Sequence, residues 1–148
     1  MSLQKRDILL YNDERYVLNR DIFKSYFKDN AGKKPKSSGF NSNLLRGYFS
    51  EFKINNNQLI ATDIRIYVDI DQQNGELISK SVIDEVLPDN RFCNWFTGVL
   101  ILFLLQHDSI QPSNYLKINI TEGKLQDVRS LTEQEFAAIG NIVNDYYD

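Results

Sequence analysis

The chain has 148 residues, of which 42% are hydrophobic, 12% aromatic and 25% charged. Length and composition match one folded domain of about 100–150 residues and exclude disordered and collagen-like chains. The net charge of -3 argues against a dedicated nucleic-acid-binding protein, because such proteins carry a marked positive excess. We therefore expect a single domain spanning residues 1–148, with nucleic acid disfavoured as a partner.

The charge is unevenly distributed along the chain. Residues 1–74 carry 12 basic and 9 acidic side chains, whereas residues 75–148 carry 5 and 11. An uneven charge distribution steers a charged partner to one side of a protein, but most surface charge serves solubility. The acidic second half therefore allows two interpretations, a surface for a partner or a plain solvated face.

Cysteine usage and the first residues indicate an intracellular protein. Cys93 is the only cysteine, which excludes an intrachain disulfide and a cysteine-rich metal site. No apolar signal region follows Met1, and the longest apolar run, Val99–Leu105, is far shorter than the roughly 20 residues that cross a bilayer. We therefore expect a cytoplasmic protein that has no membrane partner.

The N-terminal residues predict a hairpin and a short helix. Residues 7–11 and 15–18 are strand-like runs that flank three polar residues favouring a turn. In residues 21–29, apolar side chains recur at spacings of three and four, and Asp21 is a suitable N-cap. This spacing predicts a helix whose apolar face consists of Ile22, Phe23, Tyr26 and Phe27.

Residues 30–43 lack periodicity and are rich in Gly, Pro, Ser and Asn, which predicts a mobile loop. The loop and the helix before it carry interleaved basic and aromatic residues, a composition typical of contacts with an acidic protein or a single nucleic-acid strand. The alternative is a solvated helix face and loop. The basic side chains are Arg20, Lys24, Lys28, Lys33, Lys34 and Lys36. Within this stretch we place the partner-binding surface at Lys33, Lys34, Lys36 and Phe40.

The most regular alternation predicts a second hairpin. Leu44–Ile54 and Leu59–Val68 are strand-like runs joined by three asparagines, a residue that tolerates the left-handed backbone of a tight turn. Residues 71–75 end in Asn-Gly and predict the next reversal. Apolar side chains alternate along the second run, so we expect one apolar face formed by Ile60, Thr62, Ile64, Ile66 and Val68.

The following residues predict further strands. Residues 77–87 fit either a strand or a helix, and Pro88 ends both. Residues 95–105 are the most apolar part of the chain and are typical of a central strand covered on both faces. Strand-like runs follow at residues 115–121 and around residues 125–128.

A capping box at Thr132 and Glu135 predicts a C-terminal helix with apolar residues at helical spacing, namely Phe136, Ile139, Val143 and Tyr146 or Tyr147. The elements together predict an α+β fold. Its mostly antiparallel sheet of about seven strands is curled or partly closed, with a short helix near residue 25 and a C-terminal amphipathic helix packed on it. An exposed strand edge would allow a homo-oligomer, and the sequence leaves open which strand lies at the edge.

Three segments resemble a group of small, uncharacterised bacterial α+β proteins. Residues 45–54 contain Arg-Gly-Tyr, residues 57–64 contain a leucine before Asp-Ile, and residues 94–101 contain Trp-Phe-Thr-Gly before a strand. These segments cover about a fifth of the chain. The resemblance implies no activity, but some small bacterial α+β proteins of this sort serve as immunity or partner-binding proteins, and by analogy it implies such a role.

Two features with chemical character fit a structural interpretation better than a catalytic one. His107, the only histidine, is suited to general base catalysis, but Cys93 lies in no known nucleophile motif. Residues 69–75 begin like a calcium loop, but Lys80 stands where the loop needs its closing glutamate. We therefore expect a buried cysteine, an exposed histidine and a polar turn, with no catalytic residue, no metal and no cofactor.

A charged surface on the second hairpin is the alternative site. Glu51 and Asp63 become neighbours if this hairpin forms, and Arg46 and Arg65 join the same surface. Glycosidases and metal-dependent hydrolases use two carboxylates in catalysis, so this pair allows a catalytic site. The alternative is a cross-strand ladder of salt bridges, which explains the same four charges. Trp95 is either part of the core or the wall of a ligand pocket.

The sequence therefore predicts a non-enzymatic cytoplasmic protein-binding module, an immunity or accessory protein for a bacterial partner. The alternative is a small-ligand-binding protein or a hydrolase-type enzyme that uses the Trp95 region and the surface of Arg46, Glu51, Asp63 and Arg65. The identity of the partner stays open.

Overall fold

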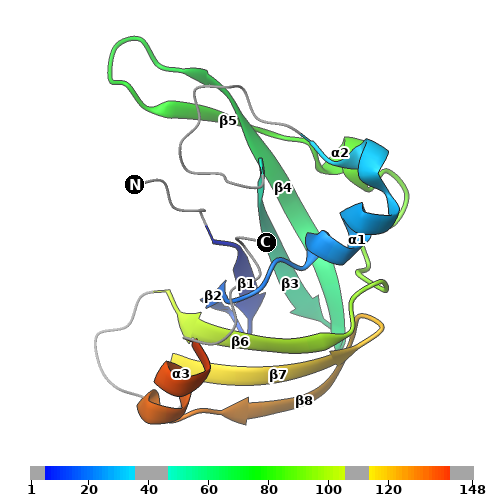
Figure 1. The fold of residues 1–148 in the computed structure, drawn as a ribbon, viewed down its shortest axis with the longest axis vertical. Coiled ribbons are helices and arrows are strands. Elements are labelled where there is room, and N and C mark those ends of the chain that lie inside the picture. The colour runs from blue at the N-terminus through cyan, green and yellow to red at the C-terminus, as the bar shows by residue number, and fades with distance from the viewer. Residues whose placement is uncertain (1–5, 36–46, 106–113, 141–148) are drawn as a thin grey trace.

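The computed structural model describes residues 6–35, 47–105 and 114–140 (Figure 1). Its strands are β1 (Ile8–Tyr11), β2 (Glu14–Leu18), β3 (Phe49–Asn55), β4 (Gln58–Ile70), β5 (Leu77–Ser81), β6 (Gly98–Leu104), β7 (Tyr115–Thr121) and β8 (Lys124–Ser130). Its helices are α1 (Phe23–Asp29), α2 (Ile83–Val86), α3 (Glu133–Gly140) and the short 3-10 helix η1 (Ala31–Lys33). The expectation of a largely antiparallel sheet with helices is confirmed.

The strands form one sheet in the order β3-β1-β2-β6-β7-β8-β4-β5. Because β4 also pairs with β3, the sheet closes on itself, and β5 stands outside the closed part as an extension of β4 (Figure 1). All neighbours are antiparallel except β1 and β3. The expected hairpins β1–β2 and β3–β4 are both present.

The contact between β8 and β4 that closes the sheet is narrow. It consists of the pair Gln58 and Lys124, with Leu59 N–H donating to Gly123 O at 2.8 Å and Leu125 N–H donating to Asn57 O at 2.7 Å. Beyond this contact, a segment of the chain before β6 runs along β4 in place of β8. Ala61 N–H donates to Arg91 O and Cys93 N–H donates to Leu59 O, both at 2.9 Å.

The prediction of one buried apolar face along β4 is wrong except at Ile64, which is fully buried. Thr62 and Val68 are exposed and Ile60 and Ile66 are only half-buried, whereas Leu59 and Ala61 of the other face are fully buried. The pairing with β3 shifts between Glu51 and Phe52, which leaves one extra residue in β4. A bulge of this kind moves the buried positions from odd to even numbers, so a simple alternation cannot describe the strand.

The core beneath α1 is a cluster of aromatic rings centred on Phe23. Phe23 is fully buried, and its ring centroid lies 5.4 Å from that of Phe27, 5.5 Å from that of Phe52 and 6.4 Å from that of Tyr48. Phe23 and Phe27 occupy one face of α1, as the helical spacing predicts. Burial of this face anchors a helix that is only seven residues long.

The remaining elements resolve the ambiguous regions. Residues 77–87 contain both a strand and a helix, because β5 ends at Ser81 and α2 begins at Ile83. Residues 98–104 form β6, a strand between β2 and β7. The predicted loop at 30–43 contains η1, and its residues from 36 onward lie outside the described part. No helix in the described residues is long and apolar enough to span a bilayer.

The capping box that begins α3 is present. Thr132 N–H donates to a Glu135 carboxylate oxygen and Glu135 N–H donates to Thr132 Oγ1, both at 3.0 Å. The Thr132 N–H, together with Arg129, holds the pKa of Glu135 below its ordinary value. Phe136 packs 4.5 Å from Tyr115 and 5.6 Å from Phe103, measured between ring centroids. The expected apolar positions Val143, Tyr146 and Tyr147 lie outside the described residues.

Candidate binding groove

A surface groove of about 500 Å³ lies between α1 and the segment that precedes β6. One wall comes from α1 and the residues just before it, and the other from three consecutive residues of that segment. The lining residues are Arg20, Asp21, Lys24, Ser25, Lys28, Trp95, Phe96 and Thr97. The groove thus combines three cationic side chains with two aromatic rings.

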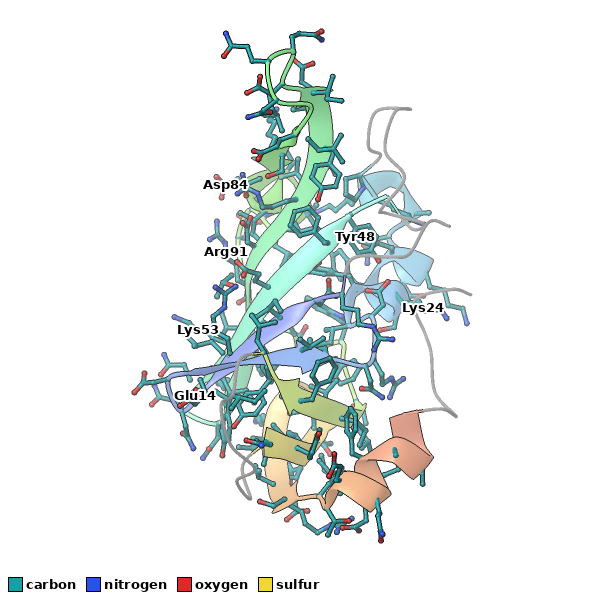
Figure 2. All side chains as sticks on the ribbon, turned by 90° about the vertical axis from the view of Figure 1, so that its left-hand side faces the viewer. Glu14, Lys24, Tyr48, Lys53, Asp84 and Arg91 are labelled. Carbon is teal, nitrogen blue, oxygen red and sulfur yellow. The ribbon has the colours of Figure 1, made fainter. Side chains whose placement is uncertain are left out.

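The periodicity of α1 places its lysines on the groove side. Lys24 and Lys28 are one helical turn apart and share a face, whereas Phe23 and Phe27 point into the core. Figure 2 shows Lys24 projecting away from the sheet, on the side opposite to Lys53. A seven-residue amphipathic helix is therefore enough to present two ammonium groups beside the aromatic wall.

Trp95 joins the two walls of the groove. Its indole Nε1–H donates to Ile22 O at 3.0 Å, and its ring centroid lies 4.6 Å from that of Tyr26 and 5.5 Å from that of Phe23. The ring is half-buried, so one part belongs to the core and another lines the groove. The two roles that the sequence offers for Trp95, core and pocket wall, are combined in one position.

Arg20 is held against the aromatic wall. Its guanidinium carbon lies 5.4 Å from the centroid of the Phe96 ring, and its Nη1 donates to Val99 O at 3.4 Å. A methyl group added at Gly98 would lie 2.6 Å from Nη1, so the glycine leaves room for the guanidinium. Stacking on an aromatic face keeps the charge of Arg20 beside the groove.

Asp21 is a buried residue of the groove lining. One carboxylate oxygen accepts the Phe23 N–H at 3.0 Å, and the other accepts the Tyr48 hydroxyl at 2.6 Å. The carboxylate thus bonds the first residue of α1 and ties the helix to the residue before β3. The N-cap position itself is Ile22, one residue after the Asp21 that the sequence predicts. Asp21 is buried and both its oxygens accept hydrogen bonds from within the chain, whereas the other charged side chains that line the groove are the cations Arg20, Lys24 and Lys28.

The described lysines of the predicted basic loop are not part of the groove. Lys33 donates from its ammonium group to Val86 O at 3.5 Å, and Lys34 is exposed. Neither residue lines the groove. Lys36 and Phe40 lie outside the described residues, and so does Arg46 of the alternative surface. The described lysines of this loop therefore lie outside the groove, although the loop directly follows α1.

The described charges of the alternative surface, those of Glu51, Asp63 and Arg65, are held in ion pairs. Glu51 and Asp63 face each other across β3 and β4, but Glu51 pairs with Arg15 at 2.7 Å and Asp63 with Arg65 at 3.1 Å. Asp63 also accepts the Ser81 hydroxyl at 2.5 Å. Neither ion pair joins β3 to β4, because Arg15 lies on β2 and Arg65 lies on the same strand as Asp63. The described charges are therefore paired, but not in the cross-strand ladder that the sequence suggests. Trp95 lies apart from these charges, in the groove.

Cys93 is unsuited to nucleophilic catalysis. The side chain is fully buried, and burial raises the pKa of its thiol far above the ordinary value. A nucleophilic cysteine needs the opposite change, because the thiolate is the reactive form. His107 lies outside the described residues. Within the described residues, no three His, Cys, Asp or Glu side chains gather to hold a metal ion.

The raised pKa of Cys93 predicts a loss of stability at alkaline pH. The unfolded chain releases the thiol proton near the ordinary pKa of 9.0, whereas the folded protein retains it. The stability that the buried thiol contributes is therefore complete below this pH and falls as the pH rises above it. From pH 8 to pH 10, urea unfolding should show a decrease about 1 kcal/mol larger for the wild type than for Cys93→Ala. Equal decreases in the free energy of unfolding of the two proteins would contradict the raised pKa of Cys93.

No family model matches this chain, and neither does any curated protein or solved structure. The groove must therefore be interpreted from its own residues. The sequence indicates that Lys24 and Lys28 share one face of α1, because they are four residues apart and lie off its apolar face. It carries no signal that joins them to Trp95, which is bonded to a residue 73 positions away.

Proposed function

We propose that this protein is a non-enzymatic binding protein whose groove takes an acidic segment of another protein. The observation that carries the proposal is the convergence of Arg20, Lys24 and Lys28 on the aromatic wall of Trp95 and Phe96. Cationic side chains beside aromatic rings attract carboxylates and provide apolar surface for the side chains between them.

The spacing of the cations suits an extended peptide. Lys24 and Lys28 are separated by about one helical turn, a rise of about 5.4–6 Å. Carboxylates at alternate positions of an extended segment are about 6.6 Å apart on the same side. Ser25 and Thr97 add hydroxyl groups along the groove. An acidic segment with charges at every second residue therefore meets both lysines.

The partner in this proposal is a protein of the same cytoplasm. The relation is that of an immunity or accessory protein to its bacterial partner, which the resemblance to small bacterial proteins suggests by analogy. The groove narrows this expectation to partners that expose an acidic, extended segment. It also moves the proposed contact from Lys33, Lys34, Lys36 and Phe40 to the side chains of α1 and Arg20.

The single tryptophan makes the proposal testable. Because Trp95 is the only tryptophan and lines the groove, its fluorescence reports on binding there. We expect a ten-residue peptide of alternating glutamate and leucine to change the emission, and its lysine-leucine counterpart to leave it unchanged. The double variant Lys24→Glu/Lys28→Glu should bind the acidic peptide at least about tenfold more weakly, since two attractions become repulsions. Raising the salt concentration should weaken the wild-type binding.

Two variants with the same change in net charge serve as controls. Lys53→Glu/Lys124→Glu changes lysines that do not line the groove and should keep the wild-type affinity. Lys33→Glu/Lys34→Glu tests the basic loop that the sequence favours. Loss of binding in this variant with retention in the α1 variant would move the contact to the loop. Unchanged affinity in the α1 variant, or no response to the acidic peptide, would refute the proposed groove.

A small anionic ligand is the second candidate for the groove. The volume of about 500 Å³ falls in the range of about 300–1,000 Å³ that small-molecule sites occupy. A thermal-shift screen of anionic metabolites distinguishes the two candidates. A metabolite that stabilises the protein, with no response to acidic peptides, would favour the ligand-binding protein.

A further inference from the structure

β5 lies at an edge of the sheet that no other described strand covers. Among the described strands it pairs only with β4, whereas β3, at the other end of the strand order, is covered by β4. Figure 1 shows that β4 and β5 form a hairpin that extends from the closed part of the sheet. Open edges expose backbone donors and acceptors and template pairing with another strand.

The backbone of β5 presents alternate residues to this open side. Val82 N–H donates to Ile64 O at 2.8 Å, and Asp71 N–H donates to Glu76 O at 2.7 Å, so residues 76 and 82 bond towards β4. In an antiparallel ladder the residues between them alternate, and Leu77, Ser79 and Ser81 therefore direct their N–H and C=O groups outward. Arg65 reaches the Ser79 carbonyl at 3.4 Å, and a carbonyl oxygen accepts a second bond.

The side chains of β5 and of Glu76, the residue before it, are complementary to the same segment of a second copy. Glu76, Ile78 and Lys80 share one face and are exposed, and Ile78 is a large apolar side chain with 44% of its surface accessible. In an antiparallel pair centred on Ile78, Leu77 of one copy bonds to the partner's Ser79. The same register sets Glu76 opposite the partner's Lys80 and Ile78 opposite the partner's Ile78.

We propose that two copies of this chain pair edge to edge through β5, in the register centred on Ile78. In this register the two exposed Ile78 side chains face each other, and a pair of opposite charges lies on either side of them. A shift by one pairing step, centred on Ser79, would place Lys80 against the partner's Ile78 and leave Glu76 outside the ladder. Charge complementarity thus selects one register.

The second unpaired edge in the described residues is less suited to this role. It comprises residues 126–130 of β8, where Asp127 accepts a hydrogen bond from Asn119 at 3.2 Å and Arg129 pairs with Glu135 at 3.1 Å. These charges are engaged within the chain. Neither Glu76 nor Lys80 forms an ion pair with another described residue, so both are available to a second copy.

The dimer is expected to be weak. One five-residue strand buries far less than the roughly 1,600 Å² of a standard interface, and contacts of this size belong to transient complexes. Sedimentation velocity of the full chain should therefore show monomer at about 10 μM and a growing share of dimer towards about 1 mM.

Charge reversal provides the test. Glu76→Lys alone and Lys80→Glu alone each place like charges opposite each other twice in the dimer, and each should weaken self-association at least about tenfold. An equimolar mixture of the two variants restores opposite charges at both positions and should recover association to the wild-type level. Glu14→Lys is a matched control on β2, far from β5 (Figure 2), and should leave association unchanged.

Three outcomes would overturn the proposal. These are a wild-type chain that stays monomeric up to about 1 mM, single variants that associate like the wild type, and a mixture that fails to recover. None of the substituted residues lines the basic groove, so the peptide titration followed by Trp95 provides an independent result. Exposed substitutions of this kind change stability little, and a melting curve checks that each variant folds.

Discussion

Replacing Phe23 by alanine is expected to lower the free energy of unfolding by about 3–5 kcal/mol. The side chain is fully buried, and its ring contacts the rings of Tyr26, Phe27, Tyr48, Phe52 and Trp95. The substitution removes the ring at the centre of this cluster and leaves a cavity that the surrounding side chains fill only in part. Urea unfolding followed by circular dichroism measures the change.

A matched substitution separates this central position from an ordinary aromatic one. Phe49 is partly exposed, and its ring lies 5.5 Å from that of Tyr67. Phe49→Ala should cost about 1–2 kcal/mol, because less surface is removed and the site remains open to water. Equal losses in the two variants would contradict the central role of Phe23. In Phe23→Ala the native emission of Trp95 should also shift to the red, since the indole packs on Phe23.

Replacing Gly123 by alanine is expected to destabilise the protein by about 3 kcal/mol. Gly123 has φ +78 in the turn between β7 and β8. A Cβ at this position would lie 2.6 Å from the backbone oxygen of Cys93 and 2.9 Å from its carbonyl carbon. A side chain therefore meets both an unfavourable backbone conformation and a backbone that cannot move aside.

The consequence for the fold is large because Gly123 sits where the sheet closes. Its N–H donates to Phe96 O and its C=O accepts from Leu59 N–H, both at 2.8 Å. Gly75 is the matched control, since its φ is +74 and nothing lies within 4 Å of an added Cβ. Gly75→Ala should cost about 1 kcal/mol from backbone strain alone. A smaller loss of unfolding free energy for Gly123→Ala than for Gly75→Ala, measured by urea unfolding, would refute the close packing of Gly123 against the Cys93 backbone.

Local chemistry explains why several turns and caps were predictable. Asn56 and Asn57 have φ of 53 and 60, the left-handed values that asparagine tolerates, and they join β3 to β4 as expected. The capping box at Thr132 and Glu135 satisfies its own backbone groups within four residues. Such interactions depend on neighbours in sequence, so one sequence suffices to predict them.

The buried face of β4 was mispredicted because alternation is a local pattern and the bulge is not. The extra residue arises from pairing with β3, where Phe52 meets Ala61 while Glu51 meets Asp63. Only the partner strand determines where the ladder slips, and each slip by one residue exchanges the two faces. The assignment of Ile60 to the buried face failed for this reason.

The sequence alone predicts which face of α1 is apolar and which is basic, since helical spacing sets Phe23 and Phe27 apart from Lys24 and Lys28. It also determined that residues 77–81 are able to form a strand. Only the tertiary structure placed Trp95 beside the lysines and left β5 at the open edge, because both depend on which distant segments pack together. Packing of this kind is decided by burial of the whole core, and no short stretch of sequence carries that information.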